Sequence, residues 1–257
     1  MPAATRWTGF IPRLGRSGIF LWTALLRAVI PPCKPEPLIR QIYFIGARSL
    51  PVIVVSGAFV GMVVALQFHD TLVRFGSVGL LGSAVGLSLV RELGPVLTAL
   101  MVIGRAGSAI CAEICIMRNE QQIDALECMA IDSYRYLIAP RLLAGIISVP
   151  LLTAIFVVIG IFGGYFVGVI LFEISPGAYF EGMYETVVWN DIVMGLVKSL
   201  VFGLLIMWIA TAKGFFLHLD DYGASGSEGV SRATTDAVVV SSIAVLCFDY
   251  LLSAIIL

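Results

Sequence analysis

Long apolar segments alternate with short polar ones along most of the chain. The first, Leu50 to Phe68, is 19 residues without a charge, close to the about 20 that a helix needs to cross the hydrocarbon core of a bilayer. Similar segments follow, and we expect an all-α integral membrane protein that forms a single domain, 1–257. The five expected transmembrane helices are 50–68, about 95–117, 137–172, 192–212 and 234–257.

The segment 77–90 is apolar but only 14 residues long, which is short for a complete span. Together with the residues up to the next polar segment it would make a helix of about 60 Å, so we expect the chain to bend at Gly94 and Pro95. A re-entrant or outer-leaflet segment fits best, and the alternative is the first part of a long kinked span.

Residues 1–48 carry seven basic side chains against the single acid Glu36. This pattern predicts an interfacial elbow helix and linker, with the arginines facing anionic lipid. Prolines at 31, 32, 35 and 37 should end the helix. The side chains expected at headgroup depth are Trp7, Phe10, Ile11, Phe20 and Trp22.

A polar, charge-dense segment at 119–134 separates two of the apolar stretches. If Asn119 caps a helix there, its apolar face would hold Ile123, Leu126, Met129, Ala130 and Ser133, and its polar face Glu120, Gln121, Asp124 and Glu127. Such a helix is too polar to cross the bilayer. It is either an ordinary solvated helix or a docking helix for a soluble partner.

Glycines spaced by four occur in two of the expected spans. Gly57 and Gly61 form one pair, and Gly160, Gly164 and Gly168 form a longer ridge. Small residues at this spacing let helix backbones approach closely. We expect them to pack helices of the same chain.

Composition limits the class of protein, and the positions of the charged residues predict its orientation in the membrane. Hydrophobic residues make up 59% and charged residues 13% of the chain, and sixteen basic residues balance seventeen acidic ones, which argues against nucleic acid as a partner. Most basic residues fall on one side of the five expected spans. The positive-inside rule then places the N-terminus in the cytoplasm and the C-terminus in the periplasm.

No motif indicates catalysis or nucleotide binding. The nearest fragment to a P-loop, GLVKS at 195–199, lacks the glycine before Lys198. The five cysteines are scattered, and although Cys111 and Cys115 share a helix face, no histidine stands near them. We therefore expect no enzyme, no metal and no cofactor in this chain.

Charged residues inside or beside the apolar stretches are costly unless they are paired or hydrated. One account is pairing between helices, and the other is a cavity for an amphipathic molecule with a zwitterionic or anionic head. An ion-coupled secondary transporter, with Glu113, Asp236 or Asp249 as proton carriers, and a structural membrane anchor are further alternatives. The residues concerned are Arg91, Glu92, Arg105, Glu113, Lys198, Asp236 and Asp249.

Three blocks of sequence resemble the MlaE (YrbE) permease family. They are RELGPVLTALMVIGRAGSAICAEI from Arg91, EQQIDALECMAIDSYRYLIAPRLLAG from Glu120 and GVSRATTDAVVVSSIAVLCFDYLLSAII from Gly229. The resemblance extends over nearly the whole chain after the N-terminal helix. It implies a homodimeric permease subunit of an ABC transporter that moves phospholipid between the inner and outer membranes of a Gram-negative bacterium and so maintains outer-membrane lipid asymmetry.

The resemblance also implies partners and an inner-membrane location. They are an MlaF-like ATPase that binds ATP and Mg²⁺, an MlaB-like STAS-domain subunit, and an MlaD-like hexamer of MCE domains above the outer face. On this view 119–134 is the cytoplasmic coupling helix. The residues expected to meet the ATPase are Glu120, Gln121, Asp124, Glu127 and Met129.

The resemblance further implies a phospholipid pocket at the dimer interface. Its expected lining is Arg91 and Glu92 with apolar residues near the outer end of the first span, Val64, Leu72 and Phe75. The chain departs from the family at Asp236, where a basic residue is usual. This departure reverses a charge at the cytoplasmic end of the last span.

Overall fold

The computed structural model describes residues 4–29, 35–218 and 226–256, and every regular element in these ranges is helical. Pro31 and Pro32, and the side chains of Trp7, Phe10 and Ile11, lie outside what is described. Five helical stretches are long and apolar enough to cross a membrane, so the predicted all-α fold with five spans is confirmed. They are Glu36–Arg74, Val78–Asn119, Tyr134–Leu171, Trp189–Phe215 and Ser227–Ile256.

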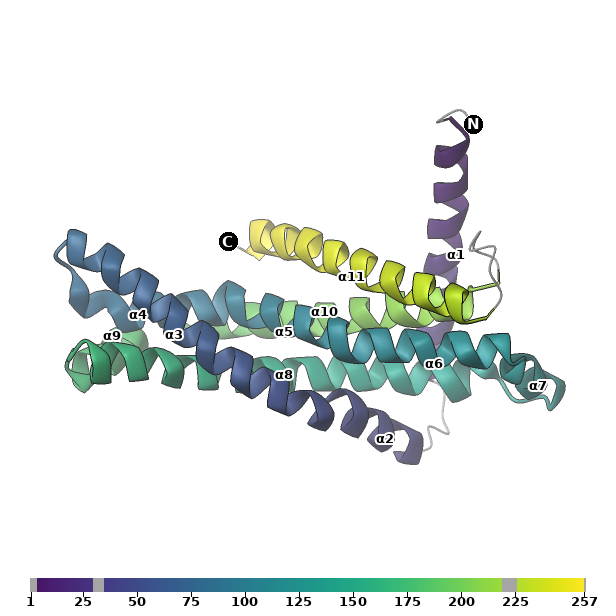
Figure 1. The fold of residues 1–257 in the computed structure, drawn as a ribbon, viewed down its shortest axis with the longest axis horizontal. Coiled ribbons are helices and arrows are strands. Elements are labelled where there is room, and N and C mark those ends of the chain that lie inside the picture. Colours follow the sequence, from purple (N-terminus) through teal and green to yellow (C-terminus); the bar gives the residue numbers. More distant parts are fainter. Residues whose placement is uncertain (1–3, 30–34, 219–225, 257) are drawn as a thin grey trace.

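The first two stretches form a long hairpin (Figure 1). The first consists of α2 (Pro35–Ile45), η1 (Ala47–Ser49) and α3 (Leu50–Arg74), so it begins earlier than the sequence suggested. The second consists of η2 (Val78–Leu80), α4 (Leu81–Ser88), η3 (Leu89–Leu93), α5 (Gly94–Val102), η4 (Ile103–Gly107) and α6 (Ser108–Asn119).

The re-entrant interpretation of 77–90 is therefore wrong, and the alternative, the first part of one long span, is confirmed, because α4 continues through η3 into α5. Proline in a helix removes one hydrogen bond and crowds the preceding turn. Here a π-helical turn, Leu89–Leu93, lies directly before Gly94 and Pro95. We infer that this wider turn absorbs the misfit and lets the helix continue.

The third stretch packs against α3 along a line of glycines. It consists of η5 (Tyr134–Ile138), α8 (Ala139–Tyr165) and η6 (Phe166–Leu171). A Cβ atom added to Gly61 would lie 1.9 Å from the carbonyl oxygen of Gly160, and one added to Gly163 would lie 2.3 Å from that of Ala58. The predicted packing within the chain is confirmed. We call Gly57, Gly61, Gly160 and Gly163 the glycine seam.

The remaining elements complete the bundle. They are α9 (Pro176–Thr186), which packs against α4, α10 (Trp189–Phe215), which packs against α8, and α11 (Ser227–Ile256). Figure 1 shows α11 at the edge of the bundle. Only 11% of its most apolar window is buried, against 33–50% in the other four stretches, so much of α11 is open to lipid or to a partner.

The N-terminal helix, α1 (Ala4–Val29), runs roughly at right angles to the bundle (Figure 1), as an interfacial helix would. Trp22 is exposed, but Phe20 is buried against the rings of Tyr134, Phe215 and Phe216. Phe20 thus packs where α1 docks on the ends of η5 and α10, and its position at headgroup depth stays a prediction.

The predicted polar helix is present as α7 (Gln122–Cys128), but it is shorter than 119–134. Asn119 ends α6 and does not cap α7, since Gln121 turns the chain with a left-handed φ of 57°. Ala130 has the same φ. These two turns break the single helix, so Ile123 is buried as predicted whereas Met129 and Ala130 are exposed.

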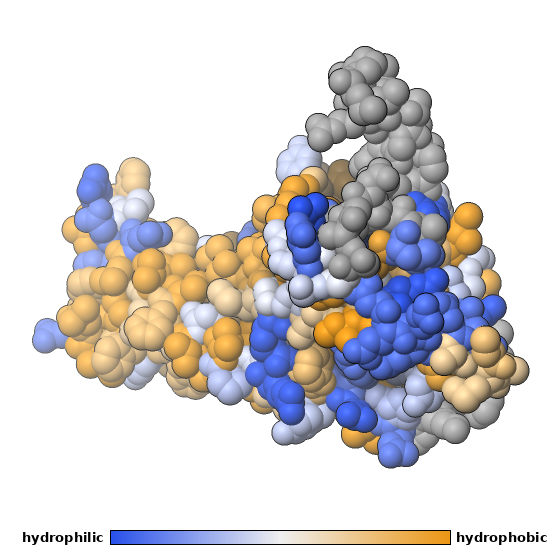
Figure 2. All heavy atoms as spheres, turned by 45° about the vertical axis from the view of Figure 1, so that its right-hand side comes forward, coloured by the Kyte–Doolittle hydropathy of each residue, from blue (hydrophilic) through white to orange (hydrophobic). Residues whose placement is uncertain are grey.

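Basic residues gather at the end of the bundle that carries α7. Figure 2 shows hydrophilic side chains over this end and hydrophobic ones along the sides of the bundle. The loops and helix ends there carry Arg16, Arg27, Arg40, Arg48, Arg118, Arg135, Arg141, Lys213 and Arg232. The opposite end carries Asp70, Arg74, Glu173, Glu181 and Glu185.

Candidate functional site

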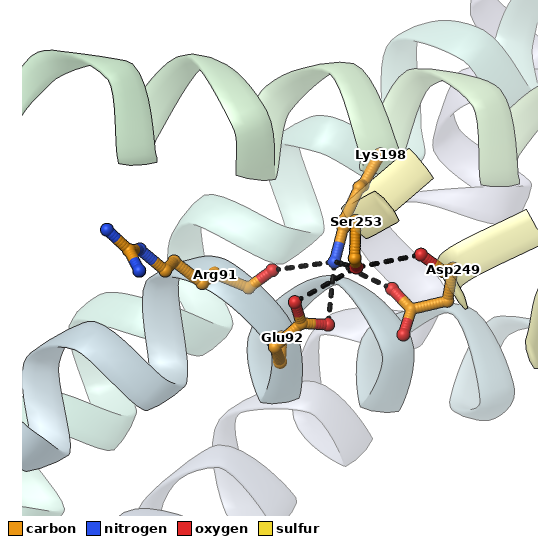
Figure 3. A network of polar contacts seen from close by, with 5 residues as sticks. All are labelled: Arg91, Glu92, Lys198, Asp249 and Ser253. Carbon is orange, nitrogen blue, oxygen red and sulfur yellow. Dashed lines mark hydrogen bonds and ion pairs between the residues drawn. The ribbon is translucent and has the colours of Figure 1, made fainter. Parts of the chain in front are cut away.

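A charged cluster lies among η3, α10 and α11 in the membrane-spanning bundle (Figure 3). The term charged cluster refers below to Arg91, Glu92, Asp191, Lys198, Asp249 and Ser253. Neighbouring residues of the π turn supply Arg91 and Glu92. On α10, Asp191 and Lys198 are seven residues apart, which places them about two turns apart on one face.

Arg91 pairs with the acid at the start of α10. Its Nε and Nη2 atoms each lie 2.7 Å from Oδ1 of Asp191. The other oxygen of Asp191 accepts a hydrogen bond of 3.0 Å from the backbone N–H of Val188. The carboxylate is thus held by the helix that it caps, and it orients the guanidinium.

Lys198 is the centre of the cluster and is fully buried. Its Nζ lies 2.6 Å from Oε2 of Glu92 and 2.9 Å from Oδ1 of Asp249. It also donates to Oγ of Ser253 at 2.7 Å and to the Arg91 carbonyl oxygen at 3.2 Å. Figure 3 shows these groups converging on Nζ from η3 and α11, while Lys198 itself extends from α10. A buried ammonium is stable only with such partners.

The cluster has an open side. Lys198 is 0% exposed, but the side chain of Glu92 is 41% exposed and that of Arg91 33%. Three carboxylates against two basic groups give a formal charge of −1 when all are ionised. An ionised carboxylate facing lipid tails costs a few kcal/mol or more, so the open side of Glu92 requires water or a polar group.

The three apolar residues predicted for the pocket have different surroundings. Val64 is buried in the packed interior, Leu72 is half-buried against it, and Phe75 is exposed at the tip of the α3–α4 hairpin. Val78 lies next to that tip. At a rise of 1.5 Å per residue, Arg91 lies about 20 Å further along the second helical stretch. Their role in a pocket stays a prediction, and for Val64 it would require the interior packing to open.

Other charges of the spans are also paired or bonded. Arg141 lies 3.0 Å from Glu113, and Arg105 donates to the Phe44 carbonyl oxygen and stacks over the Phe44 ring. Pairing between helices, one of the two accounts above, is therefore confirmed for Arg91, Lys198 and Glu113. It does not exclude the other account, because the charged cluster is both paired and partly open.

A second polar assembly, which we call the α7 joint, consists of Arg118, Asp124 and His218. Nη1 of Arg118 lies 2.8 Å from Oδ1 of Asp124 in α7, and its Nε donates to Nδ1 of His218 at 3.1 Å. The same guanidinium lies over the ring of Phe215, the last residue of α10. Partial burial and the charge of Arg118 lower the pKa of His218, so the ring accepts the hydrogen bond while neutral. The joint connects α7 to α10.

The five residues predicted to meet the ATPase are all accessible. Glu120, Gln121, Asp124 and Glu127 are exposed, as expected, and so is Met129. Glu127 accepts a hydrogen bond of 3.0 Å from Oγ of the buried Ser133. Asp124 and Glu127 lie in α7, whereas Glu120 and Gln121 precede it and Met129 follows it.

Sequence reasoning missed part of the charged cluster. Lys198 and Asp249 were recognised as costly but were not placed with Arg91 and Glu92. A usable signal exists, since Asp249 and Ser253 are four residues apart and so share a helix face. In the described residues no group of three or more His, Cys, Asp or Glu side chains could hold a metal ion.

Comparison with known proteins identifies the family. The family described as Permease MlaE matches residues 38–255. The intermembrane phospholipid transport system permease protein MlaE of Haemophilus influenzae is 42% identical over 253 residues, which cover 96% of this chain and 92% of that protein. A probable ABC transporter permease protein of Rickettsia felis is 41% identical, covering 95% and 92%. The chloroplastic protein TRIGALACTOSYLDIACYLGLYCEROL 1 of Arabidopsis thaliana is 32% identical, covering 84% and 60%. This chain belongs to the MlaE permease family.

Proposed function

We propose that this chain is the permease subunit of an ABC transporter that moves phospholipids between the inner and outer membranes of a Gram-negative bacterium. A relative that is similar over nearly its whole length carries a name that states intermembrane phospholipid transport. A partner ATPase, MlaF-like, would bind ATP and Mg²⁺ and supply the energy. STAS-domain and MCE-domain subunits, MlaB-like and MlaD-like, would complete the complex.

The proposal for the transport site rests on the exposed part of the Glu92 side chain. A phospholipid headgroup joins a phosphate to, in many lipids, an ammonium group. The exposed part of Glu92 suits the ammonium, and the exposed part of Arg91 suits the phosphate. The acyl chains would lie against apolar side chains near by. The site would thus bind a phospholipid, the substrate that the family resemblance implies.

The charge distribution supports an orientation. Basic residues gather at the α7 end of the bundle, and such residues favour the cytoplasmic side. We therefore place α7 and the N-terminus in the cytoplasm and the C-terminus in the periplasm. A cytoplasmic ATPase could then grip α7, and the α7 joint would pass its movement to α10, which carries Lys198 of the charged cluster.

We also propose a homodimer. The largely exposed α11 brings Asp249 and Ser253 to the charged cluster, so a second copy against α11 would close the open side of Glu92 into a chamber. In this arrangement the ATPases act on a symmetric pair, and a lipid between the subunits is released when the pair moves.

The ion-coupled transporter is the weaker alternative. Two of its three candidate proton carriers, Glu113 and Asp249, are engaged in ion pairs with Arg141 and Lys198. The pairing accounts for these two acids without a role in proton transport. The alternative predicts lipid movement by the purified chain with an ion gradient and no ATPase.

A reconstitution experiment tests the proposal. The chain is co-purified with its ATPase, placed in liposomes with fluorescent phospholipid, and lipid transfer is measured with and without ATP. We expect Glu92→Gln to reduce the rate of ATP-driven transfer at least about tenfold while the complex stays assembled. A tenfold lower rate corresponds to an increase of about 1.4 kcal/mol in the activation free energy of transfer. The matched control is Glu181→Gln, an exposed acid of α9, which should transfer lipid normally. Normal transfer by Glu92→Gln would contradict the role of the charged cluster.

A further inference from the structure

A cavity of about 740 Å³ lies at the α7 end of the bundle, between α2 and the neighbouring ends of α6, η5 and α8. It shares no residue with the charged cluster. Its lining combines arginines with aromatic and apolar side chains, namely Glu36, Pro37, Arg40, Gln41, Tyr43, Phe44, Arg48, Glu113, Met117, Tyr136, Leu137, Pro140 and Arg141.

One arginine of the lining is buried and has an unused donor. Arg141 is only 4% exposed, and its two terminal nitrogens are engaged by Glu113 at 3.0 Å and by the Leu137 carbonyl oxygen at 2.7 Å. Its Nε is buried and has no hydrogen-bond partner. A buried N–H of a charged group without an acceptor is costly, so an acceptor entering the cavity would be stabilised there.

Two further arginines of the lining have no acidic partner in the described part of the chain. Arg40 and Arg48 are both exposed. Arg48 lies over the rings of Tyr43 and Phe44 and makes no ion pair there. Glu36 also faces the cavity and Glu113 is taken by Arg141, so the basic groups exceed the acidic ones.

The other lining residues, and the position of the cavity relative to the membrane, indicate a lipid as the ligand. Tyr43 and Tyr136 are exposed at 60% and 56%, and α2 belongs to the first membrane-spanning stretch. The cavity therefore lies beside the basic end of the bundle, where the membrane surface begins. Aromatic rings and arginines together suit a phosphate headgroup with its glycerol and upper chains.

We propose that this cavity binds the phosphate of an anionic phospholipid from the leaflet on the α7 side. Arg40 and Arg48 attract the headgroup, and Nε of Arg141 donates to it. The bound lipid contacts both α2 and α8 and so stabilises the packing of α2 against the bundle. This inference goes beyond the proposed function, because such binding requires neither ATP nor lipid transfer.

Native mass spectrometry of the purified full chain tests the proposal. The chain in detergent is titrated with phosphatidylglycerol, which is anionic, and with phosphatidylethanolamine, which is zwitterionic. We expect Arg40→Gln/Arg48→Gln to bind phosphatidylglycerol about 10- to 30-fold more weakly than the unchanged chain. Phosphatidylethanolamine, whose ammonium offsets the charge of its phosphate, should lose less, at most about threefold. Both positions are exposed, so the variant should keep its melting temperature.

The matched control removes two arginines that lie outside the cavity. Arg74 and Arg232 are exposed, each paired with an acid four residues earlier. Arg74→Gln/Arg232→Gln should bind phosphatidylglycerol within about twofold of the unchanged chain, because surface pairs contribute little. Equal losses in the two double variants would show a general charge effect and overturn the site.

Other outcomes also decide the proposal. Unchanged phosphatidylglycerol binding by Arg40→Gln/Arg48→Gln would overturn it, and so would displacement of the lipid by millimolar inorganic phosphate, which would indicate a site for free anions. Glu92→Gln should retain phosphatidylglycerol binding in this cavity even where ATP-driven transfer is lost. The two proposals can thus fail independently.

Discussion

Two helix contacts within the same bundle are built in opposite ways. Along the glycine seam the backbones of α3 and α8 touch, and a Cβ atom on Gly61 would lie 1.9 Å from the Gly160 carbonyl oxygen. At the charged cluster, η3, α10 and α11 meet through long polar side chains, and Glu92 remains 41% exposed. One contact is apolar and closed, whereas the other is polar and partly open.

The difference suggests which contact stays fixed during transport. Close backbone packing loses many small attractive contacts at once when it separates. Ion pairs reached by flexible side chains can exchange partners for water or for a headgroup. We therefore expect α3 and α8 to move as one unit, and the contact of α11 with η3 and α10 to open and close. The predictions below test this contrast, from the largest effect to the smallest.

Adding one methyl group to the glycine seam should have the largest effect. Gly61→Ala places a carbon where the Gly160 backbone lies, and no rotation of a side chain can relieve that clash. We expect a loss of more than about 3 kcal/mol in stability, seen as a lower melting temperature in detergent. Gly104→Ala is the control, because no atom lies within 4 Å of its added Cβ, and it should leave the melting temperature nearly unchanged.

Removing the buried ammonium should destabilise the chain by about 3–5 kcal/mol. Lys198→Met leaves the carboxylates of Glu92 and Asp249 without their common partner. The same thermal measurement on Lys198→Met/Glu92→Gln/Asp249→Asn should show most of the stability restored, since the uncompensated charges are gone. If the triple variant is no more stable than Lys198→Met, packing and not charge holds this contact together.

Breaking the α7 joint should affect coupling more than stability. Arg118→Gln removes the ion pair to Asp124 and the bond to His218. Because Asp124, the acid of the pair, is 54% exposed, we expect a stability change within about 1 kcal/mol. ATP-driven lipid transfer should fall severalfold while ATP hydrolysis by the complex continues. Transfer and hydrolysis that fall in parallel would indicate lost assembly instead.

The smallest effect concerns pH. The pKa of His218 is lowered in the folded chain, so the unfolded chain takes up its proton first as the pH falls below about 6.5. The contribution of neutral His218 to the stability of the folded chain is therefore fully present above about pH 6.5 and is lost as the pH falls further. His218→Gln should flatten the decline of the melting temperature between about pH 7 and pH 5. An equally steep decline in the variant would exclude His218 as its source.

Hydropathy predicted the five spans because each consists of a long run of apolar residues, and glycine spacing predicted the seam of Gly61 and Gly160. The continuous second span was expected only as the alternative, because the compensation of Pro95 by a π turn leaves no mark in the sequence. The break at Gln121 was missed for a similar reason, since glutamine rarely takes a left-handed φ.

The charged cluster was only half predictable. The sequence shows that Arg91, Glu92, Lys198 and Asp249 are expensive in lipid, but which of them pair depends on how α10 and α11 are placed beside η3. Asp191 gave no signal of its own, because an acid near a helix start is common, and Ser253 was marked only by its spacing of four residues from Asp249. Their partners become evident only in three dimensions.

One measurement tests the contrast between the two contacts most directly. A photoreactive amino acid is placed at Ser88, one turn before Glu92, or at Phe162, an exposed residue of α8, in the complex with its ATPase in native membrane. We predict that phospholipid cross-linked at Ser88 decreases when ATP is hydrolysed, whereas cross-linking at Phe162 to bulk lipid does not change. Cross-linking at Ser88 that is unaffected by ATP would contradict the account.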